Sequence, residues 1–565
     1  MYSSSHQRML HTSSKTIITW LFLITIVLYT LYSSNIILFH DDQEDCTTPT
    51  TKENLQISNT SSETTETMDT TDEGDENKKP LVDKLPRPRE VVVVDNDGDG
   101  DDDGGGGGGD GEVEAEVEAH AEEETNKEGE EYENNSPVVL RLTPKQMYGR
   151  QETDVKHIVF GIAGSSNLWH IRKEYIKIWW RPNKTRGVVW LDQKVKTQRN
   201  EGLPEIHISG DTSKFRYTNR QGQRSALRIS RVVTETLKLG MKDVRWFVMG
   251  DDDTVFMVDN VVRILSKYNH KHFYYIGSSS ESHVQNMHFS YAMAYGGGGF
   301  AISYPLAQEL AKMQDRCIQR YPSLYGSDDR IQACMAELGV PLTKEAGFHQ
   351  YDVYGDLLGL LGAHPVAPLV SLHHLDVVQP IFPRMTRVLA LKHLMRSVNQ
   401  DSGSIMQQSI CYDKHNYWSI SVSWGYVVQI LRGVLSPREM EMPSRTFLNW
   451  YRRADYTAYA FNTRPVARHP CQKPFVYYMS KTHFDPATKQ VIGIYNHDKS
   501  KPPFCRWRMN SPEKITSVVV TKKPDPSRWK KSPRRDCCRI LSPQKKATTL
   551  YLWVGNCHEG EVTEL

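Results

Sequence analysis

The sequence predicts an α/β domain built on a mainly parallel sheet, followed by a β-rich module. Between residues 156 and 340, short apolar segments alternate with segments of helical periodicity, which is typical of a parallel sheet covered by helices. After about residue 400, period-two alternation becomes the main pattern. At 565 residues, the chain is long enough for more than one domain with a sizeable core.

The N-terminal region predicts a membrane anchor. Residues 17–39, IITWLFLITIVLYTLYSSNIILF, carry no charge and are long enough to cross a bilayer. Arg8 and Lys15 precede this segment and DDQED follows it, so the positive-inside rule places the N-terminus in the cytosol. A cleaved signal peptide is the alternative. Signal peptides have a shorter apolar core that is followed by a cleavage site of small residues, and no clean site of that kind follows residue 39. We expect a cytoplasmic tail (1–16), a retained anchor (17–39) and a type II topology.

Residues 40–152 are expected to form a disordered acidic stem. They are rich in Thr, Glu, Asp and Gly, and such a composition buries too little apolar surface to offset chain entropy. DNDGDGDDD (95–103) begins like a calcium-binding loop, but the twelfth position is Gly106 instead of the bidentate Glu. We interpret this run as a solvated acidic tract.

The near-neutral total charge of +1 conceals an acidic stem and a basic body. Residues 1–40 carry a net charge of +2 and residues 41–136 carry −25, which leaves +24 for residues 137–565 within the total of +1. A basic body suits an anionic ligand such as a nucleotide sugar or an acidic glycan. Nucleic acid is a poorer candidate, because the basic residues are spread out and no zinc-finger, helix-turn-helix or RNP-type pattern occurs.

The cysteines indicate an oxidising, lumenal compartment. Eight of the nine lie in the body without a CxxC metal pair, so disulfides are expected. We expect Cys317 to pair with Cys334, because they flank a short segment, and we leave the other pairings open. Cys46 could link two chains, which keeps a homodimer open. Sequons for N-glycosylation occur at Asn59, Asn134 and Asn183.

The elements of the α/β domain follow one another from about Val155. Buried strands are predicted where apolar runs end at glycine or aspartate, and helices where apolar residues recur at helical spacing. The predicted strands are 156–164, 187–192, 244–250 and 272–277, and the predicted helices are 171–180, 225–240 and 259–268. In the C-terminal module, SISVSWGYVVQIL (419–431) and PFVYYMS (474–480) alternate like strands.

The stretch WFVMGDDDTVF (246–256) carries the clearest chemical signal, because a hydrophobic strand runs into three adjacent aspartates. Adjacent carboxylates repel one another and are costly to bury without a cation. A divalent metal such as Mn²⁺ or Mg²⁺ takes oxygen ligands and could also hold a diphosphate. The alternative is a helix cap formed by Asp253 with Thr254, but one aspartate would suffice for that.

Three more motifs follow in order. AYGGGGFAISYPLAQEL (294–310) predicts a glycine turn, a strand and a helix, and glycine allows a ligand to approach the backbone closely. LYGSDDRIQACMAELGV (324–340) places two aspartates at a helix start, where acidic caps are common. VSLHHLD (370–376) ends an apolar stretch with two histidines.

Together these four motifs resemble the fringe-like β-1,3-glycosyltransferases of glycosyltransferase family 31, and most of all the plant fringe-related branch. The resemblance covers roughly Val155 to Pro383. It implies a GT-A fold for residues 153–400 and a Golgi-resident, single-pass type II protein. It also implies an inverting transfer of a hexose or N-acetylhexosamine from a UDP-sugar to a glycan or glycoprotein hydroxyl, in β-1,3 linkage. The role of residues 401–565 stays open.

The resemblance also implies roles for individual residues. Asp253 would bind the metal directly, with Asp251 and Asp252 towards the sugar and ribose and Asp251 within reach of the metal. Fringe has two histidines separated by one residue, whereas here they are adjacent. The remaining candidates are His373 or His374 as metal ligand, Asp329 as general base with Asp328 as the alternative, Gly297 and Gly298 in the cleft, and Asp192 in the donor site.

Two classes of function are compatible with these residues. The first is the active transferase, in which one carboxylate acts as base and the metal takes the place of a general acid. Hydrolysis is a poor rival, because glycosidases need two facing carboxyl groups. The second is a transferase-like protein that only binds carbohydrate or serves as a scaffold. It predicts a lost aspartate motif or base, and the sequence keeps both.

Overall fold

The computed structural model describes residues 152–197, 201–451, 453–455, 457–498, 505–506, 509–541 and 548–563. All of them belong to one compact unit, Leu140–Leu565. The predicted tail (1–16), anchor (17–39) and stem up to residue 151 lie outside the described residues. Within the described ranges, no helix is long and apolar enough to cross a membrane.

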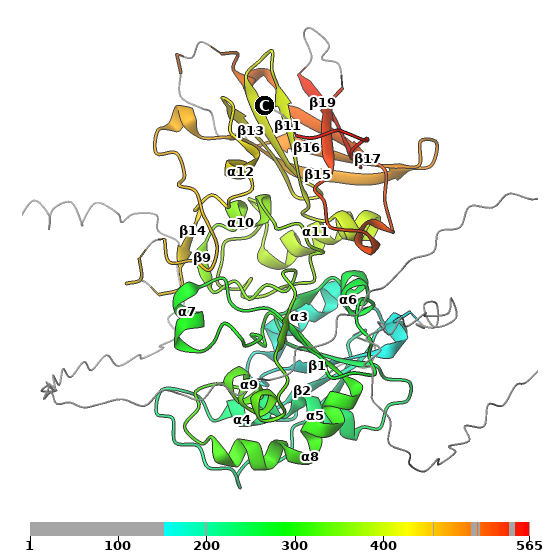
Figure 1. Ribbon diagram of the computed structural model, residues 1–565, viewed down its shortest axis with the longest axis vertical. Helices are drawn as coiled ribbons and strands as arrows, with labels where there is room; N and C mark the ends of the chain where they lie inside the picture. Colours follow the sequence, from blue (N-terminus) through cyan, green and yellow to red (C-terminus); the bar gives the residue numbers. More distant parts are fainter. Residues whose placement is uncertain are drawn as a thin grey trace, which may run out of the picture. The chain divides into compact units, whose positions relative to one another are not determined.

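A seven-stranded sheet forms the first part of this unit (Figure 1). The predicted mainly parallel arrangement is confirmed, because β7 alone runs against its neighbours β4 and β6. The carboxyl ends of β1, β2, β4 and β6 therefore meet at the same edge. The strands, in sheet order, are β3 (Glu205–Ile208), β2 (Arg186–Leu191), β1 (Ile158–Ala163), β4 (Trp246–Asp251), β7 (Phe300–Ser303), β6 (Tyr275–Gly277) and β8 (Leu342–Lys344).

Helices cover both faces of the sheet (Figure 1). Successive residues of β1 alternate between two cores, because side chains of a strand point to opposite faces. Ile158 and Phe160 pack with α3 and α6, whereas Val159 packs with α5 and α8. The helices are α3 (Trp169–Trp179) and α6 (Val258–Leu265) on one face, and α4 (Ser225–Ser230), α5 (Val232–Lys238), α8 (Tyr304–Arg320) and α9 (Asp328–Glu337) on the other.

Two predicted elements were wrong in detail. The predicted helix 225–240 is two helices, because Arg231 has ψ near −4° and its N–H bonds to the carbonyl of Arg228, three residues back. The predicted strand 419–431 is a hairpin that turns at Gly425, which has a φ of +73°. Glycine adopts this left-handed backbone without steric cost.

The predicted β-rich module is a closed eight-stranded barrel. Its interior is filled by aliphatic and aromatic side chains such as Ile420, Val428, Tyr477 and Val520. The strands, in barrel order, are β11 (Gln408–Asp413), β12 (Trp418–Ser423), β13 (Val427–Arg432), β15 (Phe475–Asp485), β16 (Gln490–His497), β17 (Ser517–Lys522), β19 (Thr549–Gly555) and β18 (Cys537–Ile540).

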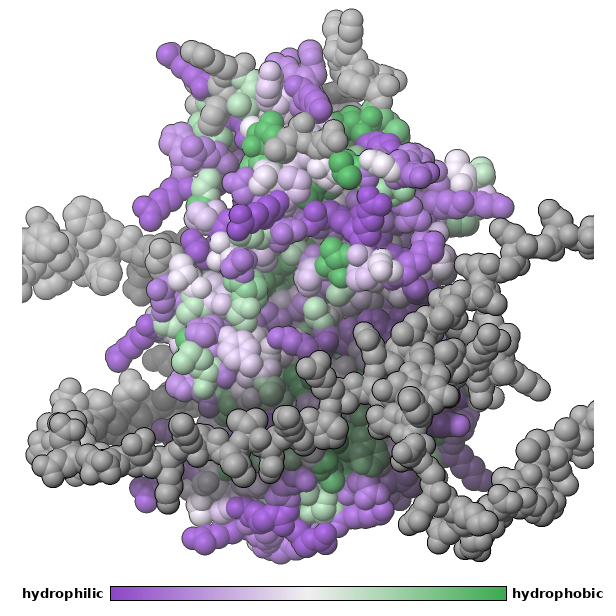
Figure 2. All heavy atoms as spheres, in the orientation of Figure 1, coloured by the Kyte–Doolittle hydropathy of each residue, from purple (hydrophilic) through white to green (hydrophobic). Residues whose placement is uncertain are grey.

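The barrel and the sheet share one hydrophobic core. Helix α11 (Arg387–Asp401) packs against both α3 and β15. Strand β14 (Phe447–Asn449) pairs antiparallel with β9 (Val353–Gly355), so a segment that follows residue 401 belongs to the α/β half. On the face shown in Figure 2, hydrophilic side chains predominate and hydrophobic ones form separate small patches.

Short elements complete the described unit. They lie before and between the longer strands and helices. These are β5 (Val255–Phe256), α7 (His283–His288), α10 (Leu358–Gly362), β10 (Ser371–Leu372), α12 (Pro437–Met440) and the 3₁₀ turns η1 (Val155–His157), η2 (Ser402–Ser404), η3 (Pro470–Gln472), η4 (Pro512–Lys514) and η5 (Arg528–Lys530).

All eight cysteines of the body form disulfides. The expected Cys317–Cys334 bond is confirmed and joins α8 to α9. Cys411–Cys538 joins β11 to β18, which share only one backbone pair, Ile410 with Cys537. The disulfide therefore strengthens the weakest seam of the barrel. The other two bonds are Cys471–Cys505 and Cys537–Cys557.

Replacing both Cys411 and Cys538 by Ala should lower the free energy of unfolding by about 2–4 kcal/mol, because the disulfide closes a loop with a sequence separation of 127. Chemical denaturation of the secreted body would measure the loss. A non-reducing peptide map of the unchanged protein should contain the Cys411–Cys538 link. A map that joins Cys411 to another cysteine would contradict this barrel closure.

Candidate active site

The three adjacent aspartates form a tight turn at the carboxyl end of β4. Asp252 is 2% exposed and Asp253 is fully buried. The Thr254 hydroxyl accepts a hydrogen bond from the Asp251 N–H (2.8 Å) and donates one to the Gly297 carbonyl (2.7 Å). Helix α6 begins only at Val258 and has no side-chain cap. The alternative in which an aspartate caps this helix is therefore wrong.

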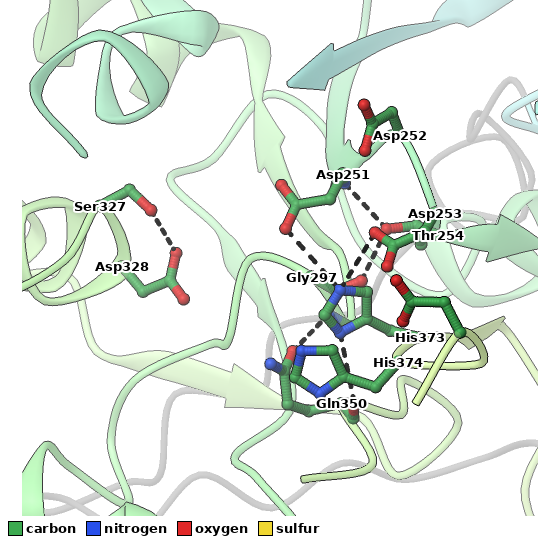
Figure 3. Close-up of polar contacts among 12 residues, drawn as sticks. Asp251, Asp252, Asp253, Thr254, Gly297, Ser327, Asp328, Gln350, His373 and His374 are labelled. Carbon is green, nitrogen blue, oxygen red and sulfur yellow. Dashed lines mark hydrogen bonds and ion pairs between the residues drawn. The ribbon is translucent and has the colours of Figure 1, made fainter. Parts of the chain in front are cut away.

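Pairing of β5 with β10 brings His373 to the aspartates. Val255 lies opposite Leu372, so His373 follows directly beside the turn. Its Nε2 lies 3.4 Å from Asp253 Oδ1 and 3.8 Å from Asp251 Oδ2 (Figure 3). Its Nδ1 lies 3.3 Å from the Gln350 carbonyl, which accepts a hydrogen bond from that nitrogen. Nε2 is thereby left to face the carboxylates, in the manner of a metal-binding histidine.

His374 has a different environment. Its backbone is left-handed, with a φ of 55°, and its Nδ1 lies 3.1 Å from Asp352 Oδ1. Its ring stacks on Trp450, with centroids 4.8 Å apart, and Trp450 stacks in turn on Tyr354. The sequence did not decide which histidine binds the metal. His373 joins the aspartate cluster, whereas the His374 ring packs against the His373 ring.

The cluster of Asp251, Asp253 and His373 fits a divalent cation. One ligand atom from each residue lies within 4.8 Å of the others, which suits ligands around one ion. Both carboxylate oxygens of Asp253 are buried and accept no hydrogen bond among the described residues. Buried carboxylates are normally hydrogen-bonded, paired or bound to a metal. Asp253 has only ionic contacts, with His373 and with Arg172 (3.2 Å).

The pKa values of these groups reflect burial and their mutual charges. Burial raises the pKa of Asp251 well above its usual value, and Asp253 and Asp328 raise it further. Burial also raises the pKa of Asp252, to about 6. Burial acts in the same direction on Asp253, but His373 and Arg172 outweigh it and lower that pKa. Burial lowers the pKa of His373, but Asp253 more than compensates.

Asp252 and Asp192 lie outside this three-residue cluster. Asp252 accepts hydrogen bonds from the Arg172 guanidinium (3.1 Å) and the Ser165 N–H (3.2 Å). Asp192 accepts two from Ser166, from its N–H (2.8 Å) and its hydroxyl (2.9 Å). Both aspartates therefore order the loop after β1 at the carboxyl edge of the sheet. Ligands bind at this edge in open α/β sheets.

The glycine turn packs directly against the histidine side of the site. A Cβ on Gly297 would lie 2.1 Å from the His373 ring, so no other residue fits there without displacing that ring. The Gly298 N–H donates to Gln350 Oε1 (2.7 Å), and its carbonyl accepts a hydrogen bond from the Ser371 hydroxyl. The turn therefore holds His373 and Gln350 in position.

The two aspartates at the start of α9 are oriented differently. Asp329 accepts hydrogen bonds from the N–H groups of Tyr325 (2.8 Å) and Gly326 (3.0 Å), so it closes the turn before the helix. Asp328 points across towards Asp251 and accepts a hydrogen bond from the Ser327 hydroxyl at 3.0 Å (Figure 3). Burial raises the pKa of Asp328 to about 6, against hydrogen bonds from Gly296 and Ser327.

The sequence analysis missed four residues of this site. Arg172 lies on α3 and contacts Asp252, Asp253 and Asp376. Gln350, Asp352 and Trp450 hold the two histidines. In the sequence Arg172 looks like any surface residue of a helix, and Trp450 lies far from every motif. No local pattern could have identified them.

The comparisons with known families agree with this geometry. A family model described as "Fringe-like" matches residues 153–357. This match supports a fringe-like glycosyltransferase over that part of the chain. A second model, described as "Protein of unknown function, DUF604", matches residues 285–538 and so covers most of the barrel. The search of curated proteins found no match.

The residues of the candidate site are not all covered by the fringe-like match. The fringe-like match includes the aspartate turn, the glycine turn and α9, whereas His373 and Trp450 lie only in the second match. The residues that complete the cluster therefore lie beyond the fringe-like match. Membership of a plant branch stays a prediction.

Replacing Gly297 by Ala should weaken Mn²⁺ binding by about 10- to 100-fold, because the added methyl group displaces His373. Calorimetric titration of the secreted body with Mn²⁺ would measure this. Gly362→Ala is the matched control, since its added Cβ meets nothing closer than 3.7 Å. Equal Mn²⁺ affinity for Gly297→Ala and the unchanged protein would remove His373 from the metal site.

Proposed function

We propose that this protein is an inverting, metal-dependent glycosyltransferase that moves a hexose or N-acetylhexosamine from a UDP-sugar to a hydroxyl of a glycan or glycoprotein, in β-1,3 linkage. The observation that supports this best is the Asp251–Asp253–His373 cluster with Asp328 facing it across the sheet edge. The fringe-like match supports transfer chemistry in general. The UDP-sugar donor, the metal dependence and the β-1,3 linkage are parts of this proposal that the family match does not supply.

Asp251, Asp253 and His373 would hold the divalent cation, and Mn²⁺ or Mg²⁺ suits their oxygen and imidazole ligands. When bound, the cation supplies Lewis-acid stabilisation of the diphosphate leaving group. Arg172 contributes a positive charge beside Asp252 and Asp253. The hydrogen bond from His373 to Gln350 keeps Nε2 directed at the aspartates.

We assign the general base to Asp328. The resemblance favoured Asp329, but both oxygens of Asp329 accept backbone N–H groups of its own turn. Asp328 points towards Asp251, and its raised pKa of about 6 makes it a better proton acceptor than an ordinary carboxylate while leaving it ionised at neutral pH. It would take the proton from the acceptor hydroxyl as that oxygen attacks the anomeric carbon and the diphosphate departs.

The cellular setting is proposed from the sequence. The apolar segment 17–39, the basic residues before it and the cysteine usage favour a single-pass type II protein of the Golgi membrane with a lumenal catalytic part. Four disulfides in the body are consistent with an oxidising lumen. A homodimer through Cys46 stays a prediction.

The second candidate is a protein with this fold that binds carbohydrate without catalysis. It predicts that the carboxylates have lost their geometry. Asp253 is buried and accepts no hydrogen bond among the described residues, and Asp328 is directed towards Asp251; both observations favour the enzyme instead. A UDP-release assay on residues 137–565, with a panel of UDP-sugars in manganese and in chelator, separates the two. Metal-dependent release from one donor supports the enzyme, and its absence together with absent UDP binding supports the scaffold.

Asp253→Asn should abolish manganese-dependent UDP binding, because it removes a charge from a buried ligand. Isothermal titration with UDP, with and without manganese, would measure this. Asp485→Asn is the control, since Asp485 lies in the β15–β16 hairpin of the barrel. UDP affinity unchanged by Asp253→Asn would defeat the assignment.

Asp328→Asn should eliminate transfer and leave UDP binding intact, whereas Asp329→Asn should retain transfer unless the turn before α9 opens. Because only the ionised carboxylate accepts a proton, the rate of the unchanged enzyme should fall as the pH drops through about 6. Single-turnover rates across a pH series would measure both effects. If Asp329→Asn alone were inactive with normal UDP affinity, the base would be Asp329.

A further inference from the structure

A second cavity lies beside the candidate active site and shares no residue with the metal cluster. Its volume is about 520 Å³, within the usual range of ligand pockets. One wall comes from the α/β half, including Ser278–Glu281, Lys344 and Phe348. The other comes from the C-terminal half, including Glu441–Pro443 and Ala460–Asn462. The proposed reaction uses none of these groups.

The cavity opens at the same sheet edge as the aspartate turn. Ser278–Glu281 follow β6 directly, and Lys344 is the last residue of β8. Both strands run parallel to β4, because β7 lies antiparallel between β4 and β6. Two strand spacings separate β6 from β4, which puts the two sites roughly 10 Å apart along the edge. A short oligosaccharide can span that distance.

One stretch of chain forms the wall between the two sites. Gln350 contacts His373 on the metal side, and the neighbouring His349 lines the cavity. A network also joins them, because the Ser280 hydroxyl donates to Asp352 (2.6 Å) and Asp352 pairs with His374. The two sites are therefore connected through a shared stretch of chain and through Asp352.

The cavity wall is pre-organised by buried polar groups. Glu281 accepts the Tyr351 N–H (2.7 Å) and pairs with His349 Nδ1 (2.9 Å). His349 Nε2 lies 2.8 Å from His364 Nε2. These three titratable residues are each less than 10% exposed, and they already make hydrogen bonds to one another and to Tyr351, Pro365 and Gln407. The lining groups left to bind a ligand include the hydroxyl groups of Ser278 and Ser279, the Asn462 amide and the Lys344 ammonium group.

The remaining lining is amphipathic. Apolar side chains such as Phe348, Leu360 and Phe461 lie beside Ser278, Ser279, Lys344 and Asn462. Lys344 donates to the Ser279 hydroxyl and pairs with no carboxylate in the described part of the chain. A sugar ring matches such a lining, because its C–H faces are apolar and its edge carries hydroxyl groups. A purely apolar ligand would leave the hydroxyl, amide and ammonium groups without partners.

We propose that this cavity is a carbohydrate-binding subsite for a unit of the acceptor distant from the reacting hydroxyl. This inference rests on the proposed transferase function, which supplies the acceptor. It assigns the C-terminal half a direct task, since Met442, Asn462 and their neighbours form one wall. Remote binding of this kind orients an acceptor and selects among acceptors.

Two substitutions would fill the cavity from opposite walls. Ala460 and Ala346 are both exposed at the lining, so a tryptophan at either position can enter the cavity without disturbing the core. The Ala460 N–H still donates to the Glu281 carbonyl (3.0 Å) in Ala460→Trp, because only the side chain changes. Ala487→Trp, in the exposed β15–β16 turn, is the matched control.

The test uses saturation-transfer NMR on the secreted body. The probes are methyl glycosides of mono- and disaccharides containing glucose, galactose, xylose, arabinose, N-acetylglucosamine and glucuronic acid. At least one probe should bind the unchanged protein and Ala487→Trp, and should bind Ala460→Trp and Ala346→Trp at least about tenfold more weakly. If every bound probe binds all four proteins equally, or if none binds, the subsite does not exist as proposed.

UDP titration in manganese on the same four proteins separates this inference from the function on which it rests. Equal UDP affinity in all four, with sugar binding lost in the two cavity variants, supports the subsite. If the unchanged protein binds no UDP, the transferase function fails, while the sugar measurement still reports on the cavity. Binding of p-nitrophenol, but of no methyl glycoside, would overturn the carbohydrate assignment in favour of an aromatic ligand.

Discussion

The repulsion among three carboxylates at the end of β4 is the constraint around which this site is organised. Asp252 and Asp253 are almost fully buried, and buried charges need compensation. Two distant segments supply the compensating charges, because Arg172 lies on α3 and His373 directly follows β10. The glycine turn, Gln350 and the Trp450 stack then keep His373 in place. Most of the site serves to hold these charges together.

The sequence predicted what is encoded locally. Apolar runs that end in glycine or aspartate identified β1, β2 and β4, and the mainly parallel sheet followed from their alternation with helices. The strand β7 was predicted within 294–310, but its antiparallel direction was not, and the short strands β3 and β8 were not predicted, because neighbouring residues do not specify which strands pair. The split of the helix at Arg231 also depends on its tertiary setting, where its guanidinium contacts Glu235 and Asp315.

The same limit applied to the choice between adjacent residues. The sequence alone does not distinguish His373 from His374. They differ in the structure through the register of β5 with β10 and through the left-handed backbone of His374. Asp328 and Asp329 both begin a helix, but the turn uses one carboxylate and leaves the other facing the aspartates. The cavity could not be predicted at all, since its walls come from segments more than 160 residues apart, such as Ser278 and Asn462.

Pairing of β14 with β9 also limits how this protein can be divided. A fragment ending at residue 400 would keep every motif that the sequence displays, yet β9 would lose its partner and become an open edge strand. Tyr354 would lose Trp450, and the core shared with the barrel would face water. Open edges and exposed apolar surface promote aggregation. The two halves are therefore best regarded as one unit of folding, although two different family models cover them.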